Sequence, residues 1–167
     1  LKVSNGLILF KADGNQRSKI GISPARGIPM AASYDAANNV LTIAQFSLPE
    51  GKTDYVNSLW EQQQHPFAGD AVNAYNDGPI EGKQMGKFYE LESSSPAAAL
   101  NPGQSLIHIH KTIHLKGTEE ALDFMTKKLI PKYDGRNYVC IAGVTALSGM
   151  HQDTAAQGWV DISKYTE

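Results

Sequence analysis

The sequence is poor in several features that would place a protein in a particular class. It has a single cysteine, Cys140, which excludes an internal disulfide bond. No apolar run is long enough to span a membrane. The formal net charge is only −2, so the basic surplus typical of nucleic-acid-binding domains is missing. We therefore expect an ordinary globular protein without a membrane span and without a nucleic-acid partner.

Most familiar functional motifs are also missing. The chain contains no glycine-rich phosphate loop, no paired-cysteine metal pattern, no nucleophile elbow and no internal repeat. It begins at Leu1 and shows no signal-peptide pattern, which we interpret as a leader already removed or a start within a larger protein. No cofactor is expected from these observations.

The composition favours one β-rich domain. The 167 residues are 41% hydrophobic and 19% charged, which is enough for a real core and argues against disorder. Fifteen glycines and eight prolines accompany few helical patterns. Alternating or apolar runs predict strands at residues 7–10, 19–23, 40–46, 55–61, 88–92, 106–115 and 138–144.

One helix is expected, over residues 119–130. Thr118 is a plausible N-cap, and the first turn is acidic, as suits the positive end of the helix dipole. Leu122, Met125 and Leu129 form an apolar stripe, which we interpret as core packing. Pro131 ends the pattern.

The densest set of titratable groups lies between Phe88 and Leu115. Two carboxylates, Glu90 and Glu92, alternate with apolar residues on the first predicted strand. A crowded loop with the turn signal Asn101-Pro102-Gly103 follows. The second predicted strand carries three histidines, which are His108, His110 and His114.

The longest stretch without periodicity covers residues 62–82, and a loop of this length in a compact domain is usually functional or flexible. Its segment Asn76-Asp77-Gly78-Pro79 is typical of a turn, because Asn and Asp side chains bond to nearby backbone. The same polar residues also suit contact with a ligand, and both interpretations stay open. Residues 132–167 contain no motif that we can assign.

Seven sequence blocks, taken in order, resemble a family of uncharacterised bacterial proteins with the galactose-mutarotase-like β-supersandwich fold. The resemblance runs from about Leu7 to Ile130 and is carried by RSKIG, SYDAANNVLTI, LPEG, DYVNSLWE, NAYNDGP, FYELESSSPAAAL and NPGQSLIHIHKTIH. Leu91-Glu92, Pro96 and Pro102-Gly103 also resemble the C-terminal part of aldose 1-epimerases. The resemblance implies an all-β antiparallel sandwich over residues 1–130 with one C-terminal helix. Residues 131–167 are left as an unassigned tail or an added strand pair.

The resemblance implies carbohydrate binding or aldose-epimerase-like chemistry. It places Glu92 at the position of the general base, which takes the proton of the anomeric hydroxyl while an acid protonates the ring oxygen. Residues expected to contact the sugar are Trp60, Asn73, Tyr75, Asn76, Asp77, Glu90, His108 and His110. A periplasmic or extracellular location is implied by the resemblance alone.

The chain departs from the epimerase pattern in its histidines, in lacking an N-terminal half, and in residues from about 132 onward, which fit no part of that pattern. The epimerase histidines belong to an N-terminal half of the fold, and His108, His110 and His114 follow the glutamate instead. The resemblance therefore implies that a missing half or another chain completes the sheet.

Two other functions stay open. The spacing Gly103-x4-His108-x-His110-x3-His114 loosely resembles the metal motif of a cupin-like β-barrel, because alternate histidines share one face of a strand. The third possibility is a structural β-sandwich module without a site of its own.

Overall fold

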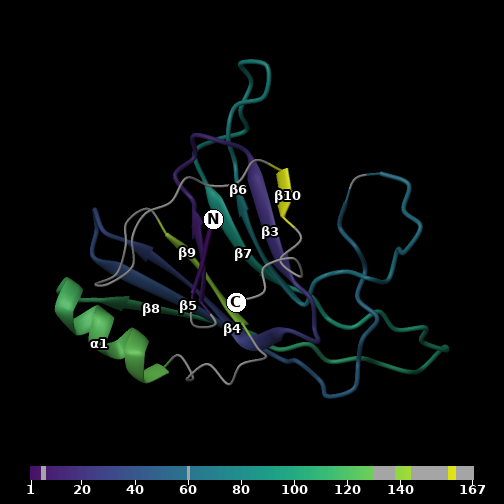
Figure 1. Ribbon diagram of the computed structural model, residues 1–167. Coiled ribbons are helices and arrows are strands. Elements are labelled where there is room, and N and C mark those ends of the chain that lie inside the picture. The colour runs from purple at the N-terminus through teal and green to yellow at the C-terminus, as the bar shows by residue number, and fades with distance from the viewer. Residues whose placement is uncertain (5–6, 60, 130–137, 144–157, 161–167) are drawn as a thin grey trace.

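The computed structural model describes residues 1–4, 7–59, 61–129, 138–143 and 158–160. Its elements form two sheets and one helix (Figure 1). In chain order they are β1 (Lys2–Ser4), β2 (Leu7–Lys11), β3 (Ser18–Ile22), β4 (Gly27–Asp35), β5 (Val40–Phe46), β6 (Val72–Asn76), β7 (Tyr89–Ser93), β8 (His110–Lys116), α1 (Glu119–Leu129), β9 (Tyr138–Gly143) and β10 (Gly158–Val160).

Over the described residues, the two sheets confirm the predicted all-β sandwich with a single C-terminal helix. The larger sheet has the strand order β1-β2-β9-β4-β5-β8, and the smaller has the order β10-β3-β6-β7. Most strand pairs are antiparallel, as expected. The pairs that involve β9 and β10 are parallel, so both sheets are mixed.

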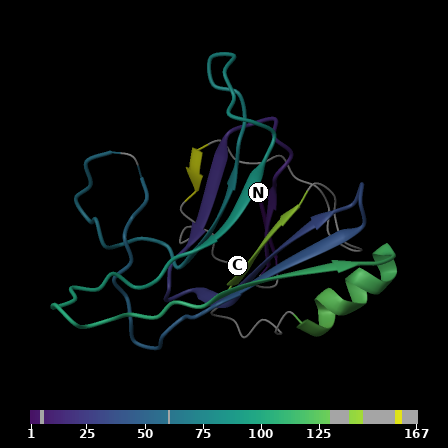
Figure 2. The ribbon, with the colours of Figure 1, turned by 180° about the vertical axis from the view of Figure 1, so that it is seen from behind.

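The main core lies between the two sheets. It contains inward side chains from both, namely Ile8, Phe10, Ala12, Ile20, Ile22, Ala31, Ala44, Phe46, Val72 and Ala74. A second cluster lies on the opposite face of the larger sheet and includes Met30, Tyr34, Leu41 and Leu122 of α1. The larger sheet is therefore buried on both faces near β4 and β5, and α1 lies beside β8 in both views (Figures 1 and 2).

The helix begins as predicted, with the Thr118 hydroxyl accepting a hydrogen bond from the Ala121 N–H at 3.3 Å. The predicted core stripe is wrong for two of its three residues. Leu122 is buried, whereas Met125 and Leu129 are each 37% exposed. Asp123 and Thr126 are buried in their place, and the Thr126 hydroxyl donates to the Leu122 carbonyl at 2.8 Å.

The predicted strand over residues 55–61 is also wrong. Among the described residues of this stretch, only Tyr55 makes a bridge, to Ala68. The chain folds back on itself here, and Asn57 N–H bonds to Pro66 O at 2.8 Å. Gly69 permits this close return, since a Cβ there would overlap the backbone of Val56. Trp60 lies outside the described residues.

The strands β1, β4, β6 and β10 were not predicted. β6 lies inside the stretch predicted to be loop, because its only apolar inward side chains are Val72 and Ala74, which give a weak apolar signal. β4 is buried on both faces, so its sequence does not alternate and shows no period of two. Within the part of the chain that is described, no helix has the length and hydrophobicity needed to cross a membrane.

Candidate functional site

The outer face of the smaller sheet gathers polar side chains from β3, β6 and β7. The register aligns Lys19 with Tyr75 and Tyr75 with Glu90 in one cross-strand row. The next row aligns Gly21 with Asn73 and Asn73 with Glu92. Because alternate residues of a strand face opposite sides, the side chains in both rows face away from the core residues Ile20, Ala74 and Leu91. We call these residues the outer-face site: Lys19, Gly21, Asn73, Tyr75, Glu90 and Glu92.

Glu92 is the centre of the outer-face site. The Lys19 ammonium donates to Glu92 Oε2 at 2.9 Å, and the Asn73 side chain also bonds to this carboxylate. Burial acts to raise the pKa of Glu92, but the Lys19 charge and hydrogen bond, helped by Asn73 and Glu90, lower it overall. The Glu92 side chain is still 41% exposed. It is therefore an ionised carboxylate that is held in place and open to solvent, as a proton acceptor requires.

Glu90 lies two residues before Glu92 on the same face of β7, and its pKa is shifted in the opposite direction. Its carboxyl group is hydrogen-bonded to that of Glu92. Burial raises the pKa of Glu90, and the adjacent charge of Glu92 raises it further. The two carboxyl groups on one strand thus differ in their tendency to hold a proton.

Asn73 contributes an unsatisfied acceptor to the outer-face site. The residue is only 4% exposed, and its side-chain Oδ1 has no hydrogen-bond partner among the described residues. Buried amide oxygens normally have a partner, so the donor to this atom has to come from outside the described residues.

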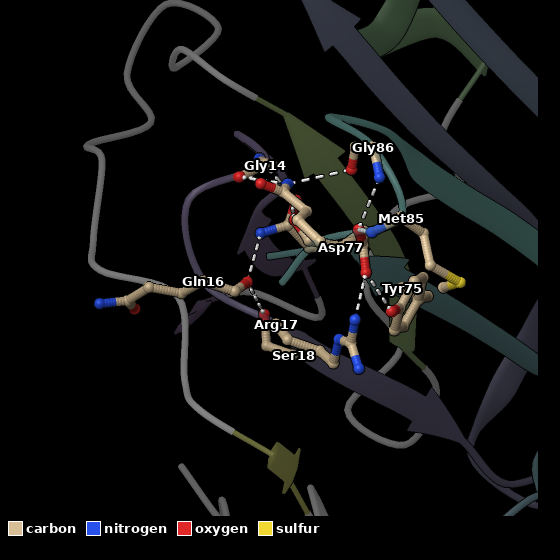
Figure 3. A network of polar contacts seen from close by, with 10 residues as sticks. Gly14, Gln16, Arg17, Ser18, Tyr75, Asp77, Met85 and Gly86 are labelled. Atoms are coloured by element: carbon tan, nitrogen blue, oxygen red, sulfur yellow. Dashed lines mark hydrogen bonds and ion pairs between the residues drawn. The ribbon is translucent and has the colours of Figure 1, made fainter. Parts of the chain in front are cut away.

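Asp77, at the end of β6, is the centre of a second polar network (Figure 3). Its Oδ1 accepts from the Tyr75 hydroxyl at 2.6 Å and lies 3.1 Å from the Arg17 guanidinium. Its Oδ2 accepts from the backbone N–H groups of Met85 and Gly86, each at 3.1 Å. The carboxylate is fully buried. Its contacts with Met85, Gly86 and Arg17 join the β6–β7 connection to the segment before β3.

Asn76 acts in the same way. Its Oδ1 accepts from Gly14 N–H at 2.9 Å, and its Nδ2 donates to the Gln16 carbonyl at 2.7 Å. Because Asn76 and Asp77 are fully buried and bonded within the protein, the structure does not support their expected contact with a ligand. The turn interpretation is wrong as well, because Asn76 is the last residue of β6 and no turn follows it. The role of both side chains is to hold two loops together.

Tyr75 belongs to the outer-face site and also donates a hydrogen bond to Asp77 in the second polar network. The pKa of its hydroxyl therefore tests this geometry. Burial and the hydrogen bond to Asp77 raise the pKa of Tyr75 to about 12. We expect the tyrosine ring resonance that disappears in a Tyr75→Phe variant to titrate near pH 12 in a carbon-13 NMR series. A midpoint close to the ordinary value of about 10 would contradict the hydrogen-bonded geometry.

The three histidines do not share one site. His108 Nε2 and His110 Nδ1 both lie within hydrogen-bond distance of the Ser93 hydroxyl, at 2.9 and 2.7 Å. His114 Nδ1 instead lies 3.0 Å from the Thr42 hydroxyl on β5. Over the described ranges, no group of three or more His, Cys, Asp or Glu side chains is arranged to hold a metal ion. Ser93 is on the face of β7 opposite to Glu92, so the histidines and Glu92 are on different sides of the sheet.

Sequence reasoning missed Lys19 and Gly21. The alternation Lys19-Ile20-Gly21-Ile22 did contain the signal, since it puts both on the outer face of a strand. Gly21 makes room for the Asp70 carboxylate, because a Cβ on residue 21 would overlap it. Trp159 of β10 pairs in register with Lys19. No local sequence pattern could have predicted this pairing, because the two residues are far apart in the chain.

The comparisons with known proteins place the chain in a family but supply no function. No curated protein and no solved structure matches the sequence. One family model matches residues 1–131, which is most of the 167-residue chain. The chain therefore belongs to the DUF6786 family, a family of unknown function.

Proposed function

We propose that the outer-face site binds a carbohydrate and that Glu92 acts there as the base of an aldose-epimerase-like reaction. The observation that carries this proposal is the Glu92 carboxylate, held ionised by Lys19 at 2.9 Å and still 41% exposed. Asn73 supports it, because a sugar hydroxyl would supply the donor that its buried Oδ1 lacks.

The reaction follows from the chemistry of a cyclic sugar. Glu92 takes the proton of the anomeric hydroxyl, an acid protonates the ring oxygen, and the bond between C1 and the ring oxygen breaks to give the open aldehyde. Rotation about the C1–C2 bond and reversal of the same proton transfers give the other anomer. The strands β3, β6 and β7 form a rigid platform, which keeps the base within reach of the bound sugar.

Replacement of Glu92 by glutamine tests the proposal. We expect Glu92→Gln to abolish sugar binding or anomeric exchange, measured by saturation-transfer NMR and polarimetry on a panel of aldoses. The variant is expected to fold, because the partly exposed ion pair with Lys19 contributes less than about 1 kcal/mol to stability.

The matched control is Glu50→Gln, which changes an exposed carboxylate in the loop after β5, outside the outer-face site. It should keep the activity of the wild-type protein. Unchanged binding and exchange in a folded Glu92→Gln variant would refute the proposed role of Glu92.

A further inference from the structure

The proposed reaction needs an acid as well as a base, and the outer-face site offers one carboxyl group that the proposal has not yet used. Glu90 lies on the same face of β7 as Glu92, two residues before it, and the two carboxyl groups are hydrogen-bonded to each other. His108 and His110 lie on the opposite side of β7 with Ser93, and His114 lies beside Thr42 of β5. Glu90 is therefore the carboxyl group that shares the outer face of β7 with the base.

Lys19 makes the two carboxyl groups unequal. In the sheet register Lys19 shares a row with Tyr75 and Glu90, yet its ammonium group reaches diagonally to Glu92 in the next row. The Asn73 amide also bonds to Glu92. Glu92 thus has two donors that stabilise its charge, whereas burial and the adjacent Glu92 charge raise the pKa of Glu90. Of the two, Glu90 therefore holds a proton more readily.

We propose that Glu90 and Glu92 act as one unit, in which Glu90 donates a proton to the ring oxygen of a pyranose while Glu92 accepts the proton of its anomeric hydroxyl. This inference rests on the proposed function. The two sugar oxygens are bonded to the same carbon, so they lie about as close together as the oxygens of a hydrogen-bonded carboxyl pair.

The step balances without another reactant. Ring opening turns the acid Glu90 into a carboxylate and the carboxylate Glu92 into an acid. Ring closure returns the proton of the former ring hydroxyl to Glu90, while Glu92 gives its proton to the aldehyde oxygen. Lys19 is a positioning residue, because it decides which of the two glutamates is ionised before the sugar binds.

Other charged groups face the pair from the neighbouring elements. Asp77, at the end of β6, raises the pKa of Glu90, whereas Lys19 on β3 lowers it. Tyr75 on β6 is the remaining titratable group in this row, and the Asp70 carboxylate lies over Gly21 in the other row. Glu92 could therefore have a higher pKa than Glu90 only if the contact between Lys19 and Glu92 were lost.

Carbon-13 NMR of the glutamate carboxyl groups tests the unit without any sugar. We expect Glu92 to titrate at lower pH than Glu90 in the wild-type protein. Lys19→Met should raise the midpoint of Glu92 and bring the two closer together. Equal midpoints in the wild-type protein would overturn the inference.

Kinetics then separate this inference from the proposed function. Glu90→Gln should slow anomeric exchange about a hundredfold or more while sugar binding stays detectable, because the glutamine amide can still donate a hydrogen bond to the ring oxygen but cannot transfer a proton. Wild-type exchange in Glu90→Gln together with loss in Glu92→Gln would overturn only the role of Glu90. Absence of exchange and of binding in the wild-type protein, over the full sugar panel, would overturn both proposals.

Discussion

Replacing Asp77 by alanine should lower the melting temperature by on the order of 10 °C. The substitution leaves the Arg17 guanidinium, the Tyr75 hydroxyl and the N–H groups of Met85 and Gly86 without their acceptor. Asp77 is fully buried, so water cannot replace the carboxylate without opening the loop. Thermal unfolding followed by circular dichroism measures the loss.

The control for this prediction is Asp35→Ala. The Asp35 carboxylate also accepts several hydrogen bonds, from Ala37 N–H and from the backbone and side chain of Asn38, but these bonds are exposed. Water can replace them, so the shift should be much smaller. Equal shifts in the two variants would mean that the burial of Asp77 contributes nothing.

The same carboxylate gives stability a pH dependence. The hydrogen bond from Tyr75, together with Gly86 N–H and Arg17, holds the pKa of Asp77 below its ordinary value, although burial acts against them. Its stabilising effect is therefore fully present above the unfolded pKa of about 3.9 and is lost as the pH falls through the lower folded pKa. The Asp77→Asn variant has no titrating carboxyl group at this position. Its melting temperature should therefore fall less steeply with decreasing pH than that of the wild-type protein, between about pH 2 and 6.

Gly78→Ala is expected to be the other strongly destabilising change. A Cβ on residue 78 would overlap the backbone of Gln16 and Arg17, which is not free to move, because Asn76 bonds to the Gln16 carbonyl at 2.7 Å. Steric overlap of this kind in a packed region typically costs about 1–3 kcal/mol or more. Chemical denaturation measures the free energy of unfolding.

Gly86→Ala is the matched control, because it adds the same methyl group in the same β6–β7 connection. Its nearest atom would be a ring carbon of Phe88 at 3.4 Å, an ordinary contact, and the N–H that donates to Asp77 stays in place. A small effect of Gly86→Ala beside a large effect of Gly78→Ala is the expected pattern. If Gly78→Ala were as mild as its control, the close approach of the two loops would be refuted.

The sequence predicted those elements whose pattern is local. β5 was expected over residues 40–46 and is found there, because its inward and outward side chains alternate and turn residues flank it. The helix start was equally clear from Thr118 and the acidic first turn. β4 and β6 were missed because one is apolar on both faces and the other has small or polar side chains.

The candidate site was predictable only in part. Glu90, Glu92, Asn73 and Tyr75 were identified, and the structure brings them together on one face. Lys19 joins them only through the pairing of β3 with β6, which links residues far apart in the chain. Asn76 and Asp77 were ambiguous for the same reason, since only the fold shows that their partners are Gly14, Gln16 and Arg17.

The position of β9 has a consequence for how the molecule forms. β9 lies between β2 and β4 and pairs with both, yet it follows all the strands of the larger sheet and α1 in the chain. During synthesis the hairpin of β4 and β5 can form early, whereas β2 cannot join it until β9 has left the ribosome. Pairings across such long stretches of chain form slowly. Until then β2 and β4 each present an open edge to other chains, so the nascent protein is most exposed to aggregation just before the larger sheet closes.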